Sequence, residues 1–231
     1  MSGGSSQPLG RWAPGTLMSG LGEAERAELT GLGGHRVFAA GEALINEGDA
    51  GKESYILLEG CCKVLCRTAD GRSILLSIRV GGDLVGEFAA FDDKPRSATV
   101  VACTTVATRV ISQRALLGYV EQRPAVAQAI RVAVVEELRR STRFRTFVSG
   151  APTVMRLSFI LDYLARTYGR PCPEGTRIEV PLSQQELASL VGVSEPSLHR
   201  ALARLRQEDS IITRYRQIVV RDLKALRFSQ S

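Results

Sequence analysis

The fold is decided by the stretch 182–206, which reads LSQQELASLVGVSEPSLHRALARLR. It opens with a capping box, in which the Ser183 hydroxyl accepts from the third helical amide and Glu186 reaches back to the Ser183 amide. The first helix ends at Gly192, a residue that readily takes the left-handed conformation of a tight turn. Ser194 then caps a second helix. The pattern predicts two short helices joined by a tight turn.

The second helix separates an apolar face from a polar one. Leu198, Leu202 and Leu205 recur at helical spacing and are expected to face inward. The remaining faces carry hydrogen-bonding side chains: Ser197, His199, Arg200, Arg204 and Arg206. A strand-like run at 211–220 follows and predicts a β-hairpin wing, with Arg214 and Arg216 at its tip. This layout is that of a winged helix-turn-helix, and it disfavours the alternative of an ordinary helical hairpin with a hydrated charged face.

The charge of the chain is concentrated in the same C-terminal part. The 231 residues have a net charge of +6, which excludes an acidic, solvating protein and favours a polyanionic partner. Residues 151–231 contain 12 Lys/Arg against 8 Asp/Glu, a net of +4, whereas residues 1–150 contain 18 against 16, a net of +2. Most of the basic residues are arginine, which suits bidentate contacts with phosphates and bases.

The region 37–111 has a different sequence pattern. Short β-branched and aliphatic runs, separated by glycine turns, are expected to be strands: 54–58, 62–66, 73–80 and 98–102. Turns about every ten residues predict an antiparallel sandwich or barrel. The pair Asp70-Gly71 between two of these runs predicts a hairpin.

A long helix is predicted from Pro124 to about Val148, ending in a hinge at 149–152. Its apolar seam consists of Ala127, Ile130, Val134 and Leu138. Such a seam can pack on the β domain, on a second copy of the chain, or on both. At the other end of the chain, residues 1–20 are rich in Gly, Ser and Pro and are expected to be a flexible tail, in which Trp12 and Leu17 can dock onto the body.

A phosphate-binding pattern lies inside the β region. Gly86-Glu87-Phe88-Ala89 is followed by Pro95-Arg96-Ser97-Ala98. Here the chain resembles the CRP/FNR superfamily of bacterial transcription regulators, whose cassette reads Gly-Glu-aliphatic-Ala and then Pro-Arg-Ser-Ala. The resemblance covers about residues 37–220.

The resemblance implies an α+β fold. Its parts would be an N-terminal cyclic-nucleotide-binding β-roll (a double-stranded β-helix or jelly-roll), a long dimerisation helix and a C-terminal winged helix-turn-helix. The corresponding ranges are a tail at 1–20, the β-roll at 21–123, the helix and hinge at 124–150, and the DNA-binding domain at 151–231.

The cassette chemistry suits a cyclic nucleotide. Arg96 can meet the phosphodiester with a planar charged fork, Ser97 can donate its hydroxyl, and Glu87 can accept from the ribose 2′-OH. The expected ligand-binding residues are Gly86, Glu87, Phe88, Ala89, Arg96, Ser97, Ala98, Ser141 and Thr142. The alternative is a structural Glu87–Arg96 salt bridge in a cassette that binds no nucleotide.

Ser141 and Thr142 continue the seam of the long helix. The family often places a Thr-Ser pair there, one residue from each subunit, to read the adenine edge, and here the order is reversed. The implied ligand is cyclic AMP, with ordinary surface hydroxyls as the alternative.

The second helix of the helix-turn-helix departs from the best-known family pattern. Glu195-Pro196 replaces the usual Arg-Glu pair, so the familiar operator does not carry over, and we interpret Glu195 as favouring the helix N-terminus rather than reading cytosine. Arg200 is retained and can pair with guanine O6 and N7. The expected DNA-binding residues are Ser183, Ser194, Glu195, Ser197, His199, Arg200, Arg204, Arg214 and Arg216.

Other classes of function are disfavoured. The sequence lacks an HExxH motif, a P-loop, a nucleophile elbow and paired Cys/His clusters, so we predict no catalytic residue, metal site or prosthetic group. Its five cysteines, without a secretory signal or an apolar span, predict a cytoplasmic protein with reduced thiols and no membrane partner. The expected partners are a second copy of the chain, a palindromic duplex operator, a cyclic nucleotide and RNA polymerase. The alternative is a regulator of the same fold that is ligand-independent or senses haem, a redox signal or a cyclic dinucleotide.

Overall fold

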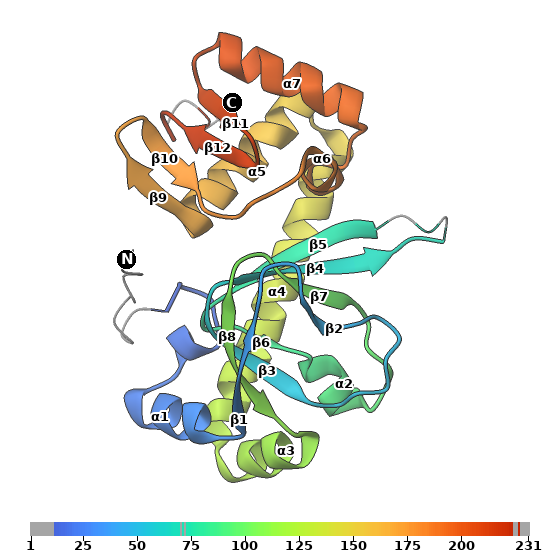
Figure 1. Cartoon of the computed structure of the whole chain (residues 1–231), viewed down its shortest axis with the longest axis vertical. Helices are drawn as coiled ribbons and strands as arrows, with labels where there is room; N and C mark the ends of the chain where they lie inside the picture. The colour runs from blue at the N-terminus through green and yellow to red at the C-terminus, as the bar shows by residue number, and fades with distance from the viewer. Residues whose placement is uncertain (1–11, 70, 72, 224–225, 227–231) are drawn as a thin grey trace. The chain divides into compact units, whose positions relative to one another are not determined.

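The computed structural model describes residues 12–69, 71, 73–223 and 226, with the backbone alone for 143–149. These residues form two compact units: residues up to 65 with 77–137, and 66–76 with the residues from 138 on. Figure 1 labels the helices and strands of both.

The first unit is built on two four-stranded sheets, with strand orders β1-β8-β3-β6 and β2-β7-β4-β5. The pairs β1–β8, β3–β8, β3–β6, β2–β7 and β4–β7 are all antiparallel. The strands are β1 (Gly34–Phe38), β2 (Ala43–Ile45), β3 (Ser54–Glu59), β4 (Cys61–Arg67), β5 (Ser73–Val80), β6 (Leu84–Val85), β7 (Thr99–Ala102) and β8 (Val106–Ile111). This is the expected β-roll, and Gly71, with φ +81°, lies in the expected turn between β4 and β5, whereas Asp70 lies outside the described residues.

Strand β3 shows why an unbroken apolar run forms a strand here. Tyr55 and Leu57 belong to one buried cluster, together with Phe38 and Val106. Ile56, pointing the other way, belongs to a second cluster that includes residues of flanking helices. Because successive side chains alternate between the faces of a strand, a strand covered on both faces must be apolar throughout. The helices that join the second cluster are α1 (Glu23–Gly31), α2 (Glu87–Asp92), α3 (Gln113–Gln122) and the start of α4.

The expected flexible tail at 1–20 is too long. Residues 12–20 end in a 3₁₀ helix, Met18–Gly20, and the Met18 amide donates to the Gly82 carbonyl at 2.9 Å. Leu17 and Met18 are 2% and 0% exposed within the second cluster, and Trp12 packs against it. The expected docking of Trp12 and Leu17 is therefore confirmed, and Met18, which the sequence analysis did not name, is buried beside them. Residues 1–11 lie outside the described residues.

The long helix α4 (Pro124–Gly150) is followed by α5 (Thr153–Tyr168). The helical conformation is therefore interrupted at Ala151-Pro152, as the sequence predicts. The division between the two compact units falls inside α4, after Glu137. In the part of the chain that the structure describes, no helix is long and apolar enough to cross a membrane.

The second unit contains a four-stranded sheet in the order β11-β12-β10-β9 beside three helices. Its elements after α5 are β9 (Gly169–Cys172), β10 (Gly175–Ile178), α6 (Gln184–Val191), α7 (Glu195–Gln207), β11 (Ile211–Arg214) and β12 (Gln217–Val220). Strand β9 is an edge strand although its sequence contains Gly169 and Pro171, because proline is tolerated where only one side of a strand is paired. Gly175, with φ +135°, makes the close approach to Val220 possible.

Candidate functional site

The phosphate-binding pattern begins at a turn that only glycine fits. Gly86 joins β6 to α2 with φ +82°, in the left-handed region. A Cβ at this position would lie 2.7 Å from Arg96 Nη1 and 2.9 Å from the Glu53 carbonyl oxygen. The turn therefore brings the backbone against the arginine that the sequence places ten residues later.

Arg96 is buried, with 4% of its surface exposed, and two backbone carbonyls hold its guanidinium. Nη1 donates to the Gly86 carbonyl at 2.9 Å, and Nη2 donates to the Glu53 carbonyl at 2.6 Å. The Glu53 carboxylate lies 3.5 Å from Nη2. Burial opposes ionisation of Glu53, but backbone amides, the Tyr55 hydroxyl and the Arg96 charge outweigh it and lower its pKa. A guanidinium has five N–H donors, so donors remain for a ligand while the side chain is fixed.

The cassette residues surround one pocket. It is an open space of about 460 Å³, a volume that includes the solvent at its mouth. Its lining includes seven of the nine predicted ligand-binding residues, namely Gly86, Glu87, Phe88, Ala89, Arg96, Ser97 and Ala98, together with Ile45, Val64, Arg79, Val85 and Val100. The arrangement offers one fixed cation, a hydroxyl, a carboxylate and an apolar wall, which is what a small organic anion requires. We name this space the cassette pocket.

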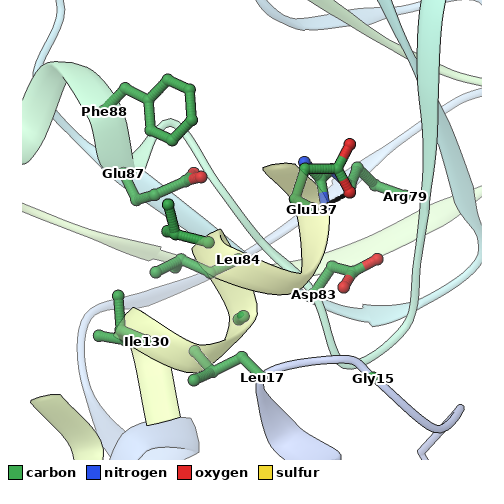
Figure 2. Close-up of a pocket in the computed structure, with 11 residues that line it drawn as sticks. Gly15, Leu17, Arg79, Asp83, Leu84, Glu87, Phe88, Ile130 and Glu137 are labelled. Atoms are coloured by element: carbon green, nitrogen blue, oxygen red, sulfur yellow. Dashed lines mark ion pairs between the residues drawn. The ribbon is translucent and has the colours of Figure 1, made fainter. Parts of the chain in front are cut away.

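Glu87 does not pair with Arg96. Arg96 instead contacts Gly86 and Glu53, so the structural Glu87–Arg96 salt bridge is the wrong alternative. Burial raises the pKa of Glu87, and the carboxylates of Asp83 and Glu137 raise it further, against the opposing charge of Arg79 and a backbone hydrogen bond. Figure 2 shows Glu87 in a neighbouring pocket that Arg79, Asp83 and Glu137 also line.

The predicted apolar seam of α4 is partly buried and partly exposed. Ile130 is buried in the core of its own unit, whereas Val134 and Leu138 are exposed, Leu138 to 61%. The seam is thus divided between the β-roll and the surface, because helical periodicity cannot say which of two neighbours a face meets. Ser141 and Thr142 are exposed, and the Thr142 hydroxyl donates to the Leu138 carbonyl at 2.9 Å. Neither is among the residues that line the cassette pocket.

The helix-turn-helix forms as the sequence predicts, with one exception. The capping box is complete, with Glu186 N to Ser183 Oγ at 3.1 Å and Ser183 N to Glu186 Oε2 at 2.7 Å. Gly192 has φ +68° in the turn. Ser194 occupies the N-cap of α7, but its hydroxyl makes no cap hydrogen bond and instead lies 3.1 Å from Ser197 Oγ. Ser194 is therefore the N-cap residue, but the side-chain cap bond that the sequence predicts is absent, because its hydroxyl is turned to donate to Ser197 Oγ.

The outer face of α7 is polar, and its inner face is apolar. Leu198, Leu202 and Leu205 are buried, as expected. Arg200 is exposed, and its Nη2 donates to Ser197 Oγ at 3.1 Å. The other exposed side chains that the sequence singled out have local partners: His199 bonds Gln184 of α6, Arg204 pairs with Glu208 at 2.8 Å, and Arg206 donates to Thr213 at 3.1 Å. Glu195 is exposed in the first turn of the helix, where its charge is favourable.

The wing places its two arginines differently. Arg214 makes a bidentate contact with Glu174, at 2.9 and 2.5 Å, and this hydrogen bonding lowers the pKa of the Glu174 carboxyl. Arg216 is exposed and has φ +51°. This left-handed conformation favours glycine, but the turn of this wing contains none. Tyr215 between them is 90% exposed. The expectation that both arginines project for phosphate contacts therefore fits Arg216 better than Arg214.

Sequence reasoning missed the residues that hold the predicted ones. Glu53 and Glu174 lie far along the chain from Arg96 and Arg214, and only the fold brings them together. Gln184 lies on the helix before the one that carries His199. Arg79 could have been found, because it is the one charged residue in the apolar run 73–80.

Comparison with known proteins agrees with both halves of this description. Residues 35–123 match the cyclic nucleotide-binding domain family, and residues 156–228 match the Crp-like helix-turn-helix domain family. A relative named CRP-like cAMP-activated global transcriptional regulator, from Mycobacterium tuberculosis, is 28% identical over 193 residues, which cover 84% of this chain and 83% of the relative. The cAMP-activated global transcriptional regulator CRP of Escherichia coli is 25% identical and covers 77% of this chain and 84% of its own length.

Solved structures agree with the fold. A CRP-family transcriptional regulator from Thermus thermophilus superposes with a TM-score of 0.71 and 26% identity, over 83% of this chain and 94% of the other. The c-di-GMP-responsive global regulator CLP of Xanthomonas campestris superposes with a TM-score of 0.75 and 22% identity, over 87% and 100% of the two chains. With its nucleotide-binding β-roll followed by a Crp-like helix-turn-helix, the chain belongs to the CRP/FNR superfamily of transcription regulators.

Proposed function

We propose that the protein is a homodimeric, sequence-specific DNA-binding regulator controlled by a cyclic nucleotide, cyclic AMP, in the cassette pocket. The observation that carries the ligand proposal is the burial of Arg96 in a fixed orientation within a pocket lined by seven of the nine predicted ligand-binding residues. Arg96 and Ser97 would bind the cyclic phosphate, and Glu87 would accept from the ribose 2′-OH. Ser141 and Thr142 do not line the cassette pocket of one chain. They would read adenine in the dimer, one residue from each subunit, as the family resemblance implies.

The dimer is supported by the surface of α4. Val132, Val134, Val135 and Leu138 are large apolar side chains that are exposed on this one helix. An apolar face of this kind is stabilised by packing against a second copy, as in a two-stranded coiled coil. Light scattering should give twice the 25.0 kDa chain mass, and Leu138→Glu should give the single-chain mass. A single-chain mass for the wild type would exclude the dimer.

DNA recognition would rest on α7 and the wing. Arg200 is exposed and would read guanine, whereas Arg216 would contact phosphates. Two copies of α7 would reach half-sites about one helical turn, roughly 34 Å, apart.

Titration calorimetry tests the ligand. Wild-type protein should bind cyclic AMP saturably, Arg96→Ala should abolish binding, and Arg114→Ala, which removes an exposed arginine on α3, should leave it unchanged. Cyclic GMP and cyclic di-GMP are titrated in parallel. Saturable binding of cyclic di-GMP alone would identify the dinucleotide as the ligand in place of cyclic AMP. Binding of none of the three would mean that these nucleotides do not control the regulator.

A further inference from the structure

Arg79 is the charged residue of the cassette pocket to which the proposed function gives no role. It lies in β5 and lines both the cassette pocket and the pocket of Figure 2. The residues common to the two linings are Arg79, Glu87 and Phe88. Arg79 therefore stands on the wall between the nucleotide site and the side of α4.

The partner of Arg79 comes from the long helix. Arg79 Nη1 lies 3.0 Å from Glu137 Oε2, and the two side chains are only 15% and 18% exposed. Figure 2 marks this ion pair. A largely desolvated pair is sensitive to any third charge that enters, because the low local dielectric strengthens every electrostatic interaction.

The surroundings of Arg79 are acidic. Asp83, Glu87 and Glu137 are its carboxylate neighbours in the lining of the same pocket, and Asp83 also accepts from the Val80 amide at 2.9 Å. An arginine only donates hydrogen bonds, so an anionic ligand and a carboxylate compete for the same N–H groups. A nucleotide beside Arg96 brings such acceptors to the other wall of the pocket.

We propose that Arg79 is a further ligand-binding residue, for which the bound nucleotide competes with Glu137 of α4. This inference rests on the proposed function, in that a cyclic nucleotide occupies the cassette pocket. Without ligand, Glu137 holds the guanidinium. With ligand, Arg79 donates to an oxygen or ring nitrogen of the nucleotide, and its contact with Glu137 weakens. Since Glu137 belongs to α4, occupancy of the pocket changes how β5 holds the long helix.

A double-mutant cycle tests the competition. Cyclic AMP is titrated into the wild type, Arg79→Gln, Glu137→Gln and the double variant. Arg79→Gln should weaken binding about tenfold, and Glu137→Gln should strengthen it about fivefold, a normal size for coupling between sites. In the Arg79→Gln background, Glu137→Gln should give no gain. The matched control is Glu28→Gln, which opens the Arg123–Glu28 pair (2.8 Å), whose residues line neither pocket, and it should change nothing.

The other outcomes are decisive too. An equal gain from Glu137→Gln in both backgrounds would mean that the carboxylate merely repels the ligand, and a loss would mean that the pair only shapes the pocket; either overturns the inference. Arg79→Lys, which keeps the charge without the planar fork, should bind between wild type and Arg79→Gln, and serves if the latter folds poorly. Failure of the wild type to bind any nucleotide would overturn the proposed function as well, whereas binding that Arg96→Ala abolishes, with an additive cycle, overturns this inference alone.

Discussion

Arg96 in the cassette pocket and Arg200 on the second helix of the helix-turn-helix are both central to the proposed function, yet the protein treats them in opposite ways. Arg96 is almost wholly buried and bonded to two backbone carbonyls of its own chain. Arg200 is exposed and bonded to one serine hydroxyl, three residues away on the same helix. The fold fixes the orientation of the Arg96 side chain through buried hydrogen bonds, whereas it leaves the Arg200 side chain in solvent.

The difference follows from the size of the two partners. A small anion is bound tightly only by groups whose positions are set in advance, because ordering a flexible side chain opposes binding. DNA offers a large surface that meets exposed side chains and supplies the ordering through many contacts. Mutations in the two regions should therefore separate effects on stability from effects on binding.

The largest expected effect is on stability. Arg96→Ala leaves the Gly86 and Glu53 carbonyls without their buried donor and should lower the free energy of unfolding by about 3 kcal/mol. Arg200→Ala should change it by less than about 0.5 kcal/mol, as for most exposed side chains. Urea unfolding monitored by circular dichroism measures both. Similar losses of unfolding free energy in the two variants would contradict the view that Arg96, unlike Arg200, stabilises the fold.

The next effect concerns DNA. On a duplex that the wild type selects from random sequences, Arg200→Ala should cost about 2 kcal/mol of binding free energy and relax the preference at one base pair. Arg216→Ala should instead weaken binding to all sequences equally and reduce the salt dependence by about one phosphate contact. Fluorescence anisotropy at several salt concentrations separates the two. Uniform losses from both variants would contradict the assignment of Arg200 to a base.

A smaller effect tests the two helix caps against each other. Ser183→Ala removes both an acceptor and half of a capping box, and should lower the free energy of unfolding by about 1 kcal/mol. Ser194→Ala is the matched control, because its hydroxyl makes no cap hydrogen bond, and it should cost only about a few tenths of a kcal/mol. Thermal unfolding of both variants gives the comparison. A larger loss from Ser194→Ala would restore the cap that the sequence predicts.

The smallest effect we expect is a pH dependence at Glu87. Burial, with the charges of Asp83 and Glu137, raises the pKa of its carboxyl above the ordinary value of 4.5. The folded protein then binds this proton more tightly than the unfolded chain does. Its contribution to stability is therefore full below the ordinary pKa and is lost as the pH rises through the folded pKa.

Glu87→Gln removes this titration. Relative to the wild type, the variant should gain stability as the pH is raised from about 4 to about 8, with little difference at the acid end. Urea unfolding across this range measures the gain. A difference between the two proteins that is constant with pH would show that burial does not perturb Glu87.

Some elements could be read from the sequence because their cause is local. The capping box at Ser183, the left-handed Gly192 and the break at Ala151-Pro152 are each decided within a few residues, and the structure has all three. The family resemblance, rather than a local rule, placed Gly86 and Arg96 in one site, and Arg96 Nη1 donates to the Gly86 carbonyl. The Ser194 cap fails because a hydroxyl one turn away offers a competing partner.

The sequence by itself determined most of the elements, their order and the family, and it named seven of the residues that line the cassette pocket. Only the tertiary structure decided that Arg96 is held by Glu53, that Arg214 is held by Glu174, that Arg79 meets Glu137 across the pocket wall, and that Met18 is core. Backbone conformation and helical or strand periodicity depend on neighbouring residues, and a sequence displays them directly. The partner of a charged or apolar side chain depends on which distant segment the fold places beside it, and no local pattern contains that information.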